Sequence, residues 1–319
     1  MLSEFDLIAK YFTRPTPNAT LGVGDDCALL TPTPGTQIAI SSDMLVSGTH
    51  FFANAEPKLL GHKSLAVNLS DLAAMGAKPV AFTLALSLPK PDEPWLAAFA
   101  DGLLSLADLY GCELIGGDTT RGPLNICITV FGEIPAGKAL RRDAAKVGDD
   151  IWVSGALGEA RLGLAGMRNE LALDAATLSA AVMRLHQPMP RVALGIALRS
   201  VANAAIDVSD GLVGDLGHIL ARSGVGATLN VDALPVGPML SEQPQEVRRR
   251  FALSGGDDYE LCFTAPPSMR AAVLNAGNET GKAVTRVGTI EATHGLRLTD
   301  AGGVPLELHA TSFDHFVAA

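Results

Sequence analysis

The sequence predicts a mixed α/β protein with two domains, and three observations support this fold class. The chain has 319 residues, which is more than one hydrophobic core usually organises. Short apolar runs alternate with amphipathic segments along its whole length, a pattern typical of alternating strands and helices. Hydrophobic residues make up 48% of the chain and charged residues 18%, so two cores can be filled and extensive disorder is not expected.

The first half of the chain alternates strands and helices and then loses its periodicity. The predicted strands span residues 27–30, 37–41, 80–88, 112–115 and 126–134, and the predicted helices span 4–12, 57–75 and 94–110. The segment 136–149 is rich in Gly, Ala, Lys and Arg and has little periodicity. We therefore interpret it as the connection between an N-terminal domain, residues 1–135, and a C-terminal domain, residues 150–319.

The second half restarts with a strand at 151–154. Helices are predicted at 159–167, 175–186 and 191–203, and a strand at 204–207 runs into a helix that begins near Gly211. Further strands are predicted at 260–264, 284–290 and 296–299. Both halves contain a Gly-Asp-Asp and a Gly-Gly-Asp string, but these matches are too short to define a repeat.

Charge and cysteine content exclude several classes of function. The formal net charge is −10, and such a surface repels phosphate backbones and anionic lipid, so we expect neither nucleic acid nor a membrane as a partner. No apolar run approaches the roughly 18 residues of a membrane span. The first six residues include the acids Glu4 and Asp6, where a signal peptide carries bases. The four cysteines form no C-x-x-C pair, so we expect core thiols in a reduced, cytoplasmic protein rather than a zinc site.

The chemically informative residues are aspartates that follow predicted strands in short loops rich in Gly, Ser and Thr. Asn68 and Asp71 add to them, and they face the same side because they lie three apart on a predicted helix. Carboxylates that converge repel one another, and Mg²⁺ relieves this because it combines one or two carboxylates with substrate phosphates. A single Gly-Asp is usually only a turn. Together, however, the loops predict a metal–phosphate site; they lie at residues 22–26, 41–43, 116–120 and 207–211.

Other signatures of enzyme chemistry are absent. The chain has no G-x-x-x-x-G-K-[ST] phosphate loop, no complete dinucleotide fingerprint, no G-x-S-x-G elbow and no protein-kinase signature set. Its seven histidines are scattered without metal-ligand spacing.

Five longer strings contain the acidic motifs. They are Gly-Val-Gly-Asp-Asp-Cys-Ala-Leu-Leu (22–30), Ala-Val-Asn-Leu-Ser-Asp-Leu-Ala-Ala-Met-Gly-Ala (66–77), Leu-Ile-Gly-Gly-Asp-Thr-Thr-Arg-Gly (114–122), Ile-Asp-Val-Ser-Asp-Gly-Leu (206–212) and Leu-Ser-Gly-Gly-Asp-Asp-Tyr-Glu-Leu (253–261). Together they resemble the thiamine-monophosphate kinase family, and the similarity runs in order from Glu4 to Phe316. The second string also resembles the wider aminoimidazole-ribonucleotide-synthetase-like superfamily. The resemblance implies that superfamily's two-domain fold, ATP and thiamine phosphate as substrates, several Mg²⁺ ions, and a homodimer in which N-terminal strands build a shared barrel.

The resemblance also implies three groups of site residues. The family's magnesium ligands correspond to Asp26, Ser41, Ser42, Asp43, Asp71, Asp118, Asp207 and Asp210. Its nucleotide contacts correspond to Gly117, Asp118, Arg142 and Ser209, and its thiamine-phosphate contacts to His50, Asp257 and Phe313. The family commonly has Glu at the position of Asp257, and often Tyr or Trp at that of Phe313. Substrate contacts are therefore where this chain departs from the pattern.

The implied mechanism needs no catalytic base. A phosphate monoester has a second pKa of about 6 and is mostly dianionic at pH 7, so the nucleophile is already formed. Metal-assisted, in-line transfer then depends on charge neutralisation and alignment.

Two alternatives remain open at this stage. Another ATP-dependent synthetase of the superfamily would share the fold, but the relatives of that kind that use a reactive cysteine carry it in an N-terminal segment or at the C-terminus. Here no cysteine precedes Cys27, and the last seven residues contain none. A non-catalytic sensor of nucleotide or thiamine phosphate would need fewer acids than the chain retains.

Overall fold

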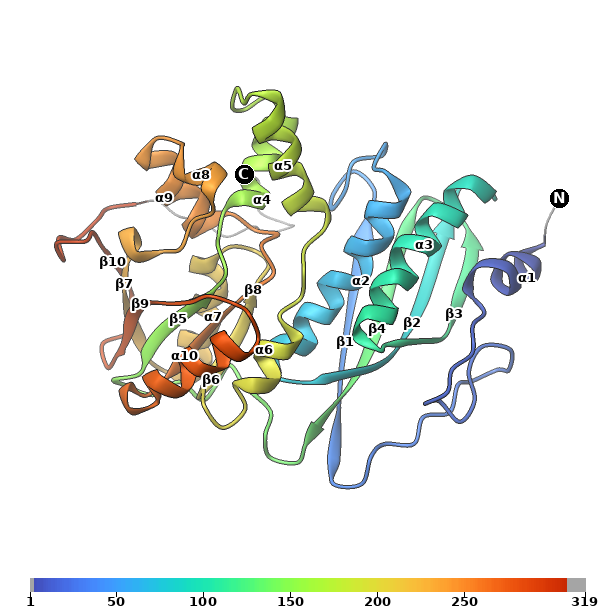
Figure 1. Ribbon diagram of the computed structural model, residues 1–319, viewed down its shortest axis with the longest axis horizontal. Helices are drawn as coiled ribbons and strands as arrows, with labels where there is room; N and C mark the ends of the chain where they lie inside the picture. The colour runs from blue at the N-terminus through green and yellow to red at the C-terminus, as the bar shows by residue number, and fades with distance from the viewer. Residues whose placement is uncertain (1–2, 309–319) are drawn as a thin grey trace. The chain divides into compact units, whose positions relative to one another are not determined.

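The structure is a computed structural model that describes residues 3–308 (Figure 1). The chain forms two compact units, which confirms a mixed α/β architecture with two domains. Unit 1 is built from the residues up to Leu72 together with Ala77–Gly137, and unit 2 from Ala73–Gly76 together with the residues from Lys138 onward. No helix within residues 3–308 combines the length and the apolar character that crossing a membrane requires.

Unit 1 is built on a four-stranded sheet with the order β1-β4-β2-β3. Strands β1 (Thr36–Val46), β4 (Asn125–Pro135) and β2 (Lys78–Leu88) are antiparallel neighbours, and β3 (Glu113–Arg121) runs parallel to β2. Helix α3 (Glu93–Tyr110) makes the crossover that a parallel pair needs. It begins where the Asp92 carboxylate accepts a hydrogen bond from the N–H of Trp95, and it ends at Gly111 in the left-handed conformation.

Helices α2 (Pro57–Ala74) and α3 cover only one face of this sheet (Figure 1). On β4 the residues Ile126, Ile128 and Val130 are fully buried, whereas the alternating residues are half-buried. On the edge strand β1 the open face exposes 63% of Ile40 and 57% of Met44. Short helices α1 (Glu4–Leu7) and η1 (Ile8–Phe12), with the chain that follows them, line a cavity against part of this open face.

Unit 2 is built on a six-stranded sheet with the order β10-β7-β9-β5-β8-β6. All its strand pairs are antiparallel except β7–β10, which is parallel. Strands β5, β6 and β8 are buried along their whole length, because helices and loops cover both of their faces. The strands are β5 (Asp150–Ser154), β6 (Ala204–Val208), β7 (Gly226–Asn230), β8 (Glu260–Ala265), β9 (Val284–Glu291) and β10 (Gly295–Thr299).

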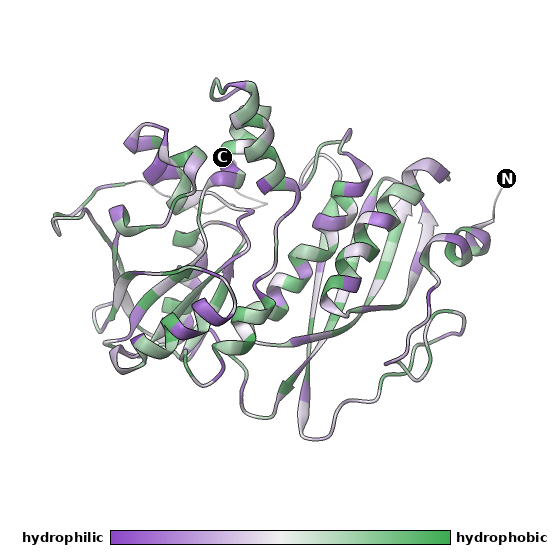
Figure 2. Cartoon of the chain, viewed as in Figure 1, coloured by the Kyte–Doolittle hydropathy of each residue, from purple (hydrophilic) through white to green (hydrophobic). Residues whose placement is uncertain are grey.

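The helices of unit 2 are amphipathic, and Figure 2 shows hydrophobic and hydrophilic residues alternating along them. Helix α7 directly follows β6, and its buried residues Leu212, Leu216 and Ile219 join the core formed with Ile206 and Val208. The helices are α4 (Glu159–Met167), α5 (Ala175–His186), α6 (Val192–Ala197), α7 (Leu212–Ser223), α8 (Pro238–Ser241), α9 (Gln245–Ser254) and α10 (Arg270–Glu279), with 3-10 turns η2 (Val231–Ala233) and η3 (Pro267–Met269).

Several predicted elements were wrong in extent or kind. Residues 27–30 form no strand, and Leu29 makes only an isolated bridge to Leu21. The predicted helix at 191–203 ends at Ala197, and the predicted helix at 4–12 divides into α1 and the π-helical η1. Two acidic strings expected in loops, 41–43 and 116–120, lie inside β1 and β3, because their backbones continue the pairing with β4 and β2.

Candidate functional site

In unit 1, strand β1 and helix α2 meet through the acids and amide that the sequence singled out. The Ser41 hydroxyl donates to Asp71 Oδ2 over 2.5 Å, and the N–H of Asp43 donates to Asn68 Oδ1 over 3.0 Å. Ser41 and Asp43 share a face because side chains alternate along a strand, and Asn68 and Asp71 share one because they lie three apart on a helix. The predicted common face of Asn68 and Asp71 is thus confirmed. We call these four residues the β1–α2 cluster.

Ser42 lies on the opposite face of β1 from Ser41. Its hydroxyl is 3.0 Å from that of Thr129 and donates to the carbonyl of Ile128 over 3.2 Å. Asp118 of β3 pairs in register with Ala85, an exposed residue of the open face. Unit 1 therefore divides its candidate residues between the two faces of one sheet.

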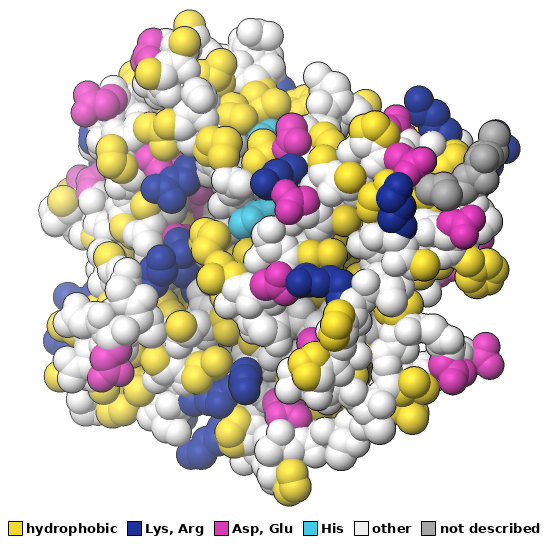
Figure 3. Space-filling model, turned by 45° about the vertical axis from the view of Figure 1, so that its right-hand side comes forward, with side chains coloured by type: hydrophobic (Ala, Val, Ile, Leu, Met, Phe, Trp, Pro, Cys, Tyr) yellow, Lys and Arg dark blue, Asp and Glu magenta, His cyan; other side chains and the backbone are white. Residues whose placement is uncertain are grey.

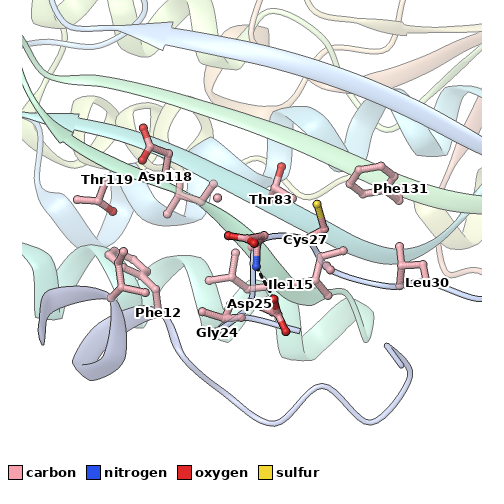
Figure 4. Close-up of a pocket in the computed structure, with 18 of the residues that line it drawn as sticks. Phe12, Gly24, Asp25, Cys27, Leu30, Thr83, Ile115, Asp118, Thr119 and Phe131 are labelled. Carbon is pink, nitrogen blue, oxygen red and sulfur yellow. Dashed lines mark hydrogen bonds between the residues drawn. The ribbon is translucent and has the colours of Figure 1, made fainter. Parts of the chain in front are cut away.

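A cavity of about 1030 Å³ lies between the N-terminal segment and the open face of this sheet (Figure 4). Asp26 and Asp118 both line it, and Figure 4 shows Asp118 and Thr119 at one end and Phe131 and Leu30 at the other. Gly117 has φ +146°, and a Cβ there would lie 1.9 Å from the carbonyl oxygen of Leu84, so only glycine fits. The acidic loop at residues 22–26 and Gly117 thus line the same cavity.

His50 follows β1 and has a defined tautomer. Its Nδ1 accepts a hydrogen bond from the N–H of Val46 over 3.0 Å. The proton of the neutral ring is therefore on Nε2, which makes Nε2 a donor.

In unit 2, the candidate residues other than Arg142 and Phe313 lie on or directly before two loops that we call the site loops, residues 209–211 and 255–259. Asp207 is buried at the end of β6, and Ser209 and Asp210 follow it. The N–H of Asp257 donates to the carbonyl of Ser209 over 2.8 Å, so the two loops are joined by their backbones.

The loop 255–259 has a strained backbone. Asp257 and Tyr259 have φ values of 66° and 50°, in the left-handed region that side chains other than glycine adopt at a cost. The Tyr259 hydroxyl donates to Asp257 Oδ1 over 3.1 Å, and the N–H of Tyr259 donates to the carbonyl of Val208 over 2.9 Å. The first bond orients the Asp257 carboxylate, and the second joins the loop to the end of β6.

Asp215 in the first turn of α7 was not predicted as a site residue. Its Oδ2 accepts hydrogen bonds from the N–H groups of Ser209 and Asp210, each over 3.1 Å. Burial, followed by the charge of Asp210, raises the pKa of Asp215 to about 7, and the nearby charge of Arg142 opposes this shift. The charge of Arg142, an exposed residue, thus acts on Asp215.

The magnesium ligands and the Phe313 contact stay predictions. Among residues 3–308, no group of three or more His, Cys, Asp or Glu side chains is placed to hold a metal ion by itself. Phe313 lies outside the described residues.

Acidic and basic side chains are interspersed on the face that Figure 3 presents, so the net negative charge is not gathered there in one patch.

Comparison with known proteins covers both units. Residues 24–134 match the N-terminal domain of the AIR synthase related proteins, and residues 146–301 match their C-terminal domain. Thiamine-monophosphate kinase of Salmonella typhimurium is 47% identical over 98% of both chains. The crystal structure of thiamine-monophosphate kinase from Stenotrophomonas maltophilia is 45% identical, covers 94% of this chain and 95% of that one, and superposes with a TM-score of 0.85.

A second similar solved structure contains bound ligands. It is AaThiL complexed with AMPPCP and TMP; it is 28% identical, covers 90% of this chain and 89% of that one, and has a TM-score of 0.78. The folds of both units, the matched domains and the near full-length identity agree, and the chain belongs to the thiamine-monophosphate kinase family.

Proposed function

We propose that the chain transfers the γ-phosphoryl group of ATP to thiamine phosphate and so forms thiamine diphosphate and ADP. The observation that carries this proposal is the 47% identity, over 98% of both chains, to a thiamine-monophosphate kinase. The related AaThiL structure contains AMPPCP, an analogue of ATP, together with TMP. In unit 2, Ser209 and Asp257, which we assign to ATP and to thiamine phosphate, are joined by one backbone hydrogen bond.

Magnesium fits the donors that the structure holds. The β1–α2 cluster and the site loops offer hydroxyl, carboxylate and amide oxygens, which are the ligands of a hard cation. Mg²⁺ keeps several waters and binds phosphate oxygens, so it needs no cage of three protein carboxylates. When bound with ATP, it would neutralise charge on the phosphates. We assign its ligands to Asp26, Ser41, Ser42, Asp43, Asp71, Asp118, Asp207 and Asp210.

The chain's own residues would bind and orient the two substrates. Arg142, with its planar fork of donors, would hold ATP phosphates, and Gly117 would let the backbone approach them closely. The Nε2–H of His50 would donate to a phosphate oxygen of thiamine phosphate. The carboxylate of Asp257 and the ring of Phe313 would contact the cationic heterocycle, since an aromatic face attracts cations. No residue needs to remove a proton, because the acceptor is already dianionic.

We also propose that the protein is a cytoplasmic homodimer. Within the described residues the sheet of unit 1 ends at the edge strands β1 and β3 and does not close on itself. Its open face exposes Ile40 and Met44, and a second copy of the same face would cover them in a shared barrel.

A coupled ADP-release assay tests the proposed reaction. Thiamine phosphate should stimulate ADP release in the presence of Mg²⁺, and free thiamine should not, because the attacking oxygen belongs to the phosphate. Equal stimulation by free thiamine would contradict the acceptor. ADP release that neither compound changes would favour another ATP-dependent enzyme of the superfamily, and tight nucleotide binding without turnover would favour a sensor.

A further inference from the structure

Asp215, a buried carboxylate in the first turn of helix α7, contacts the loop that precedes the helix. Asp215 is 3% exposed, and one of its oxygens, Oδ2, accepts from two consecutive backbone N–H groups, those of Ser209 and Asp210. Burying a carboxylate is costly unless hydrogen bonds compensate. These two bonds therefore form a pair whose geometry the loop cannot easily change.

The peptide of Ser209 is held on both of its sides. Its N–H donates to Asp215, and its carbonyl accepts from the N–H of Asp257. Ser209 and Asp210 lie outside regular secondary structure, between the end of β6 and the start of α7. Without these bonds, no strand or helix pairing fixes their backbones.

Arg142 is also connected to helix α7. Its positive charge acts on Asp215, and the carbonyl of Arg142 accepts a hydrogen bond from the Ser223 hydroxyl at the other end of α7, over 2.9 Å. Both residues assigned to ATP in unit 2, Ser209 and Arg142, are thus linked to α7.

We propose that Asp215 is a positioning residue for the nucleotide: it fixes the backbone of Ser209 and Asp210, so that these two residues meet the ATP phosphates in one arrangement. The inference rests on the proposed function, since the assignment of Ser209 and Arg142 to ATP belongs to it.

Asp149 provides a matched control within the same unit. It is 2% exposed, and it accepts from the N–H of Lys146 over 3.0 Å and from Asn203 Nδ2 over 3.0 and 2.9 Å. It is therefore an equally buried carboxylate that also caps backbone, but it contacts none of the residues assigned to a substrate. A purely structural loss should appear in both variants, and a loss of positioning only at Asp215.

The experiment compares Asp215→Ala, Asp215→Asn and Asp149→Ala in the full chain. Calorimetry with AMPPCP and Mg²⁺ gives Kd for the nucleotide, steady-state assays give KM for thiamine phosphate, and thermal melting reports the fold. Asp215→Ala should raise Kd about tenfold and leave KM for thiamine phosphate within about twofold. Asp215→Asn keeps an acceptor oxygen for the two N–H groups, so its Kd should stay within about threefold of the wild type. Asp149→Ala should lower Tm and leave Kd unchanged.

Three results would overturn the inference. They are an unchanged Kd in Asp215→Ala, equal losses for both substrates, and a Kd in Asp149→Ala that rises as much as in Asp215→Ala. If Asp215→Ala does not fold, Asp215→Asn is compared with Asp215→Ser, whose hydroxyl is too short to reach both N–H groups; equal Kd values in these two would also overturn it. A wild type that binds AMPPCP but does not phosphorylate thiamine phosphate contradicts the proposed function alone, whereas one that binds no nucleotide contradicts both.

Discussion

The β1–α2 cluster of unit 1 and the site loops of unit 2 carry similar acidic and hydroxyl side chains on different kinds of backbone. In unit 1, Ser41, Asp43 and Asp71 lie on a strand and a helix, whose ladders fix the backbone. In unit 2, Ser209, Asp210 and Asp257 lie on loops that single hydrogen bonds hold, partly in the left-handed region. The difference implies that unit 1 tolerates the loss of any one supporting bond, whereas unit 2 depends on particular neighbours.

The largest expected effects come from removing a charge in either region. Asp71→Asn and Asp210→Asn keep the shape of the side chain but remove a negative charge assigned to magnesium, so kcat should fall about a hundredfold or more. The melting temperature should change little. Asp108→Asn, at an exposed helix position paired with Arg14, is the control and should be near normal. Near-normal turnover in Asp71→Asn or Asp210→Asn would show that these acids are structural.

Two glycines of unit 1, one in the sheet and one in a loop, test whether a paired strand tolerates less change than a loop does. In β3, Gly117→Ala would push a Cβ to within 1.9 Å of a backbone carbonyl, so the free energy of unfolding should fall by at least about 2 kcal/mol. Gly24 also has a positive φ, +125°, but nothing lies within 4 Å of its Cβ position, and Gly24→Ala should cost only about 1 kcal/mol. Urea unfolding measures both. Equal losses would mean that the strand can move to accommodate the methyl group.

The smallest expected effect is on the orientation of Asp257. Tyr259→Phe removes only a hydroxyl that donates to this carboxylate, and a loss of about 1 kcal/mol corresponds to about a fivefold rise in KM for thiamine phosphate. KM for ATP should be unchanged. Tyr11→Phe makes the same chemical change at a hydroxyl that donates to Glu93, 3.0 Å away, and should alter neither KM. A parallel rise in both KM values of Tyr259→Phe would mean that the loop as a whole has loosened.

The elements that the sequence predicted best are those with strong periodicity. The helix predicted at 57–75 is α2, Pro57–Ala74, and the strand predicted at 80–88 is β2, Lys78–Leu88. Strand β7, Gly226–Asn230, was missed because Gly-Ala-Thr-Leu-Asn has no apolar run, and its pairing with β9 and β10 defines it. The strings at 41–43 and 116–120 were assigned to loops because Ser, Gly and Asp rarely form strands, and tertiary pairing overrode that preference.

For the candidate site, the sequence identified side chains that could touch a substrate but not those that hold them. Asn68 and Asp71 could be placed on one face because a helix has a fixed period. Asp215 accepts from two backbone N–H groups, and Tyr259 donates to a neighbouring carboxylate. Such bonds follow from loop geometry that no spacing rule encodes. The signal available for Asp215 was an acid in the first turn of a predicted helix, which is usually a cap.

The central claim is that the γ-phosphoryl group of ATP is transferred to thiamine phosphate, and ³¹P NMR of the complete reaction tests it most directly. With purified protein, ATP, Mg²⁺ and thiamine phosphate, the monoester signal should disappear while the two coupled signals of a diphosphate ester appear. Thiamine diphosphate should form in an amount equal to ADP, without orthophosphate. Formation of ADP and orthophosphate in equal amounts, with the monoester signal unchanged, would contradict the account.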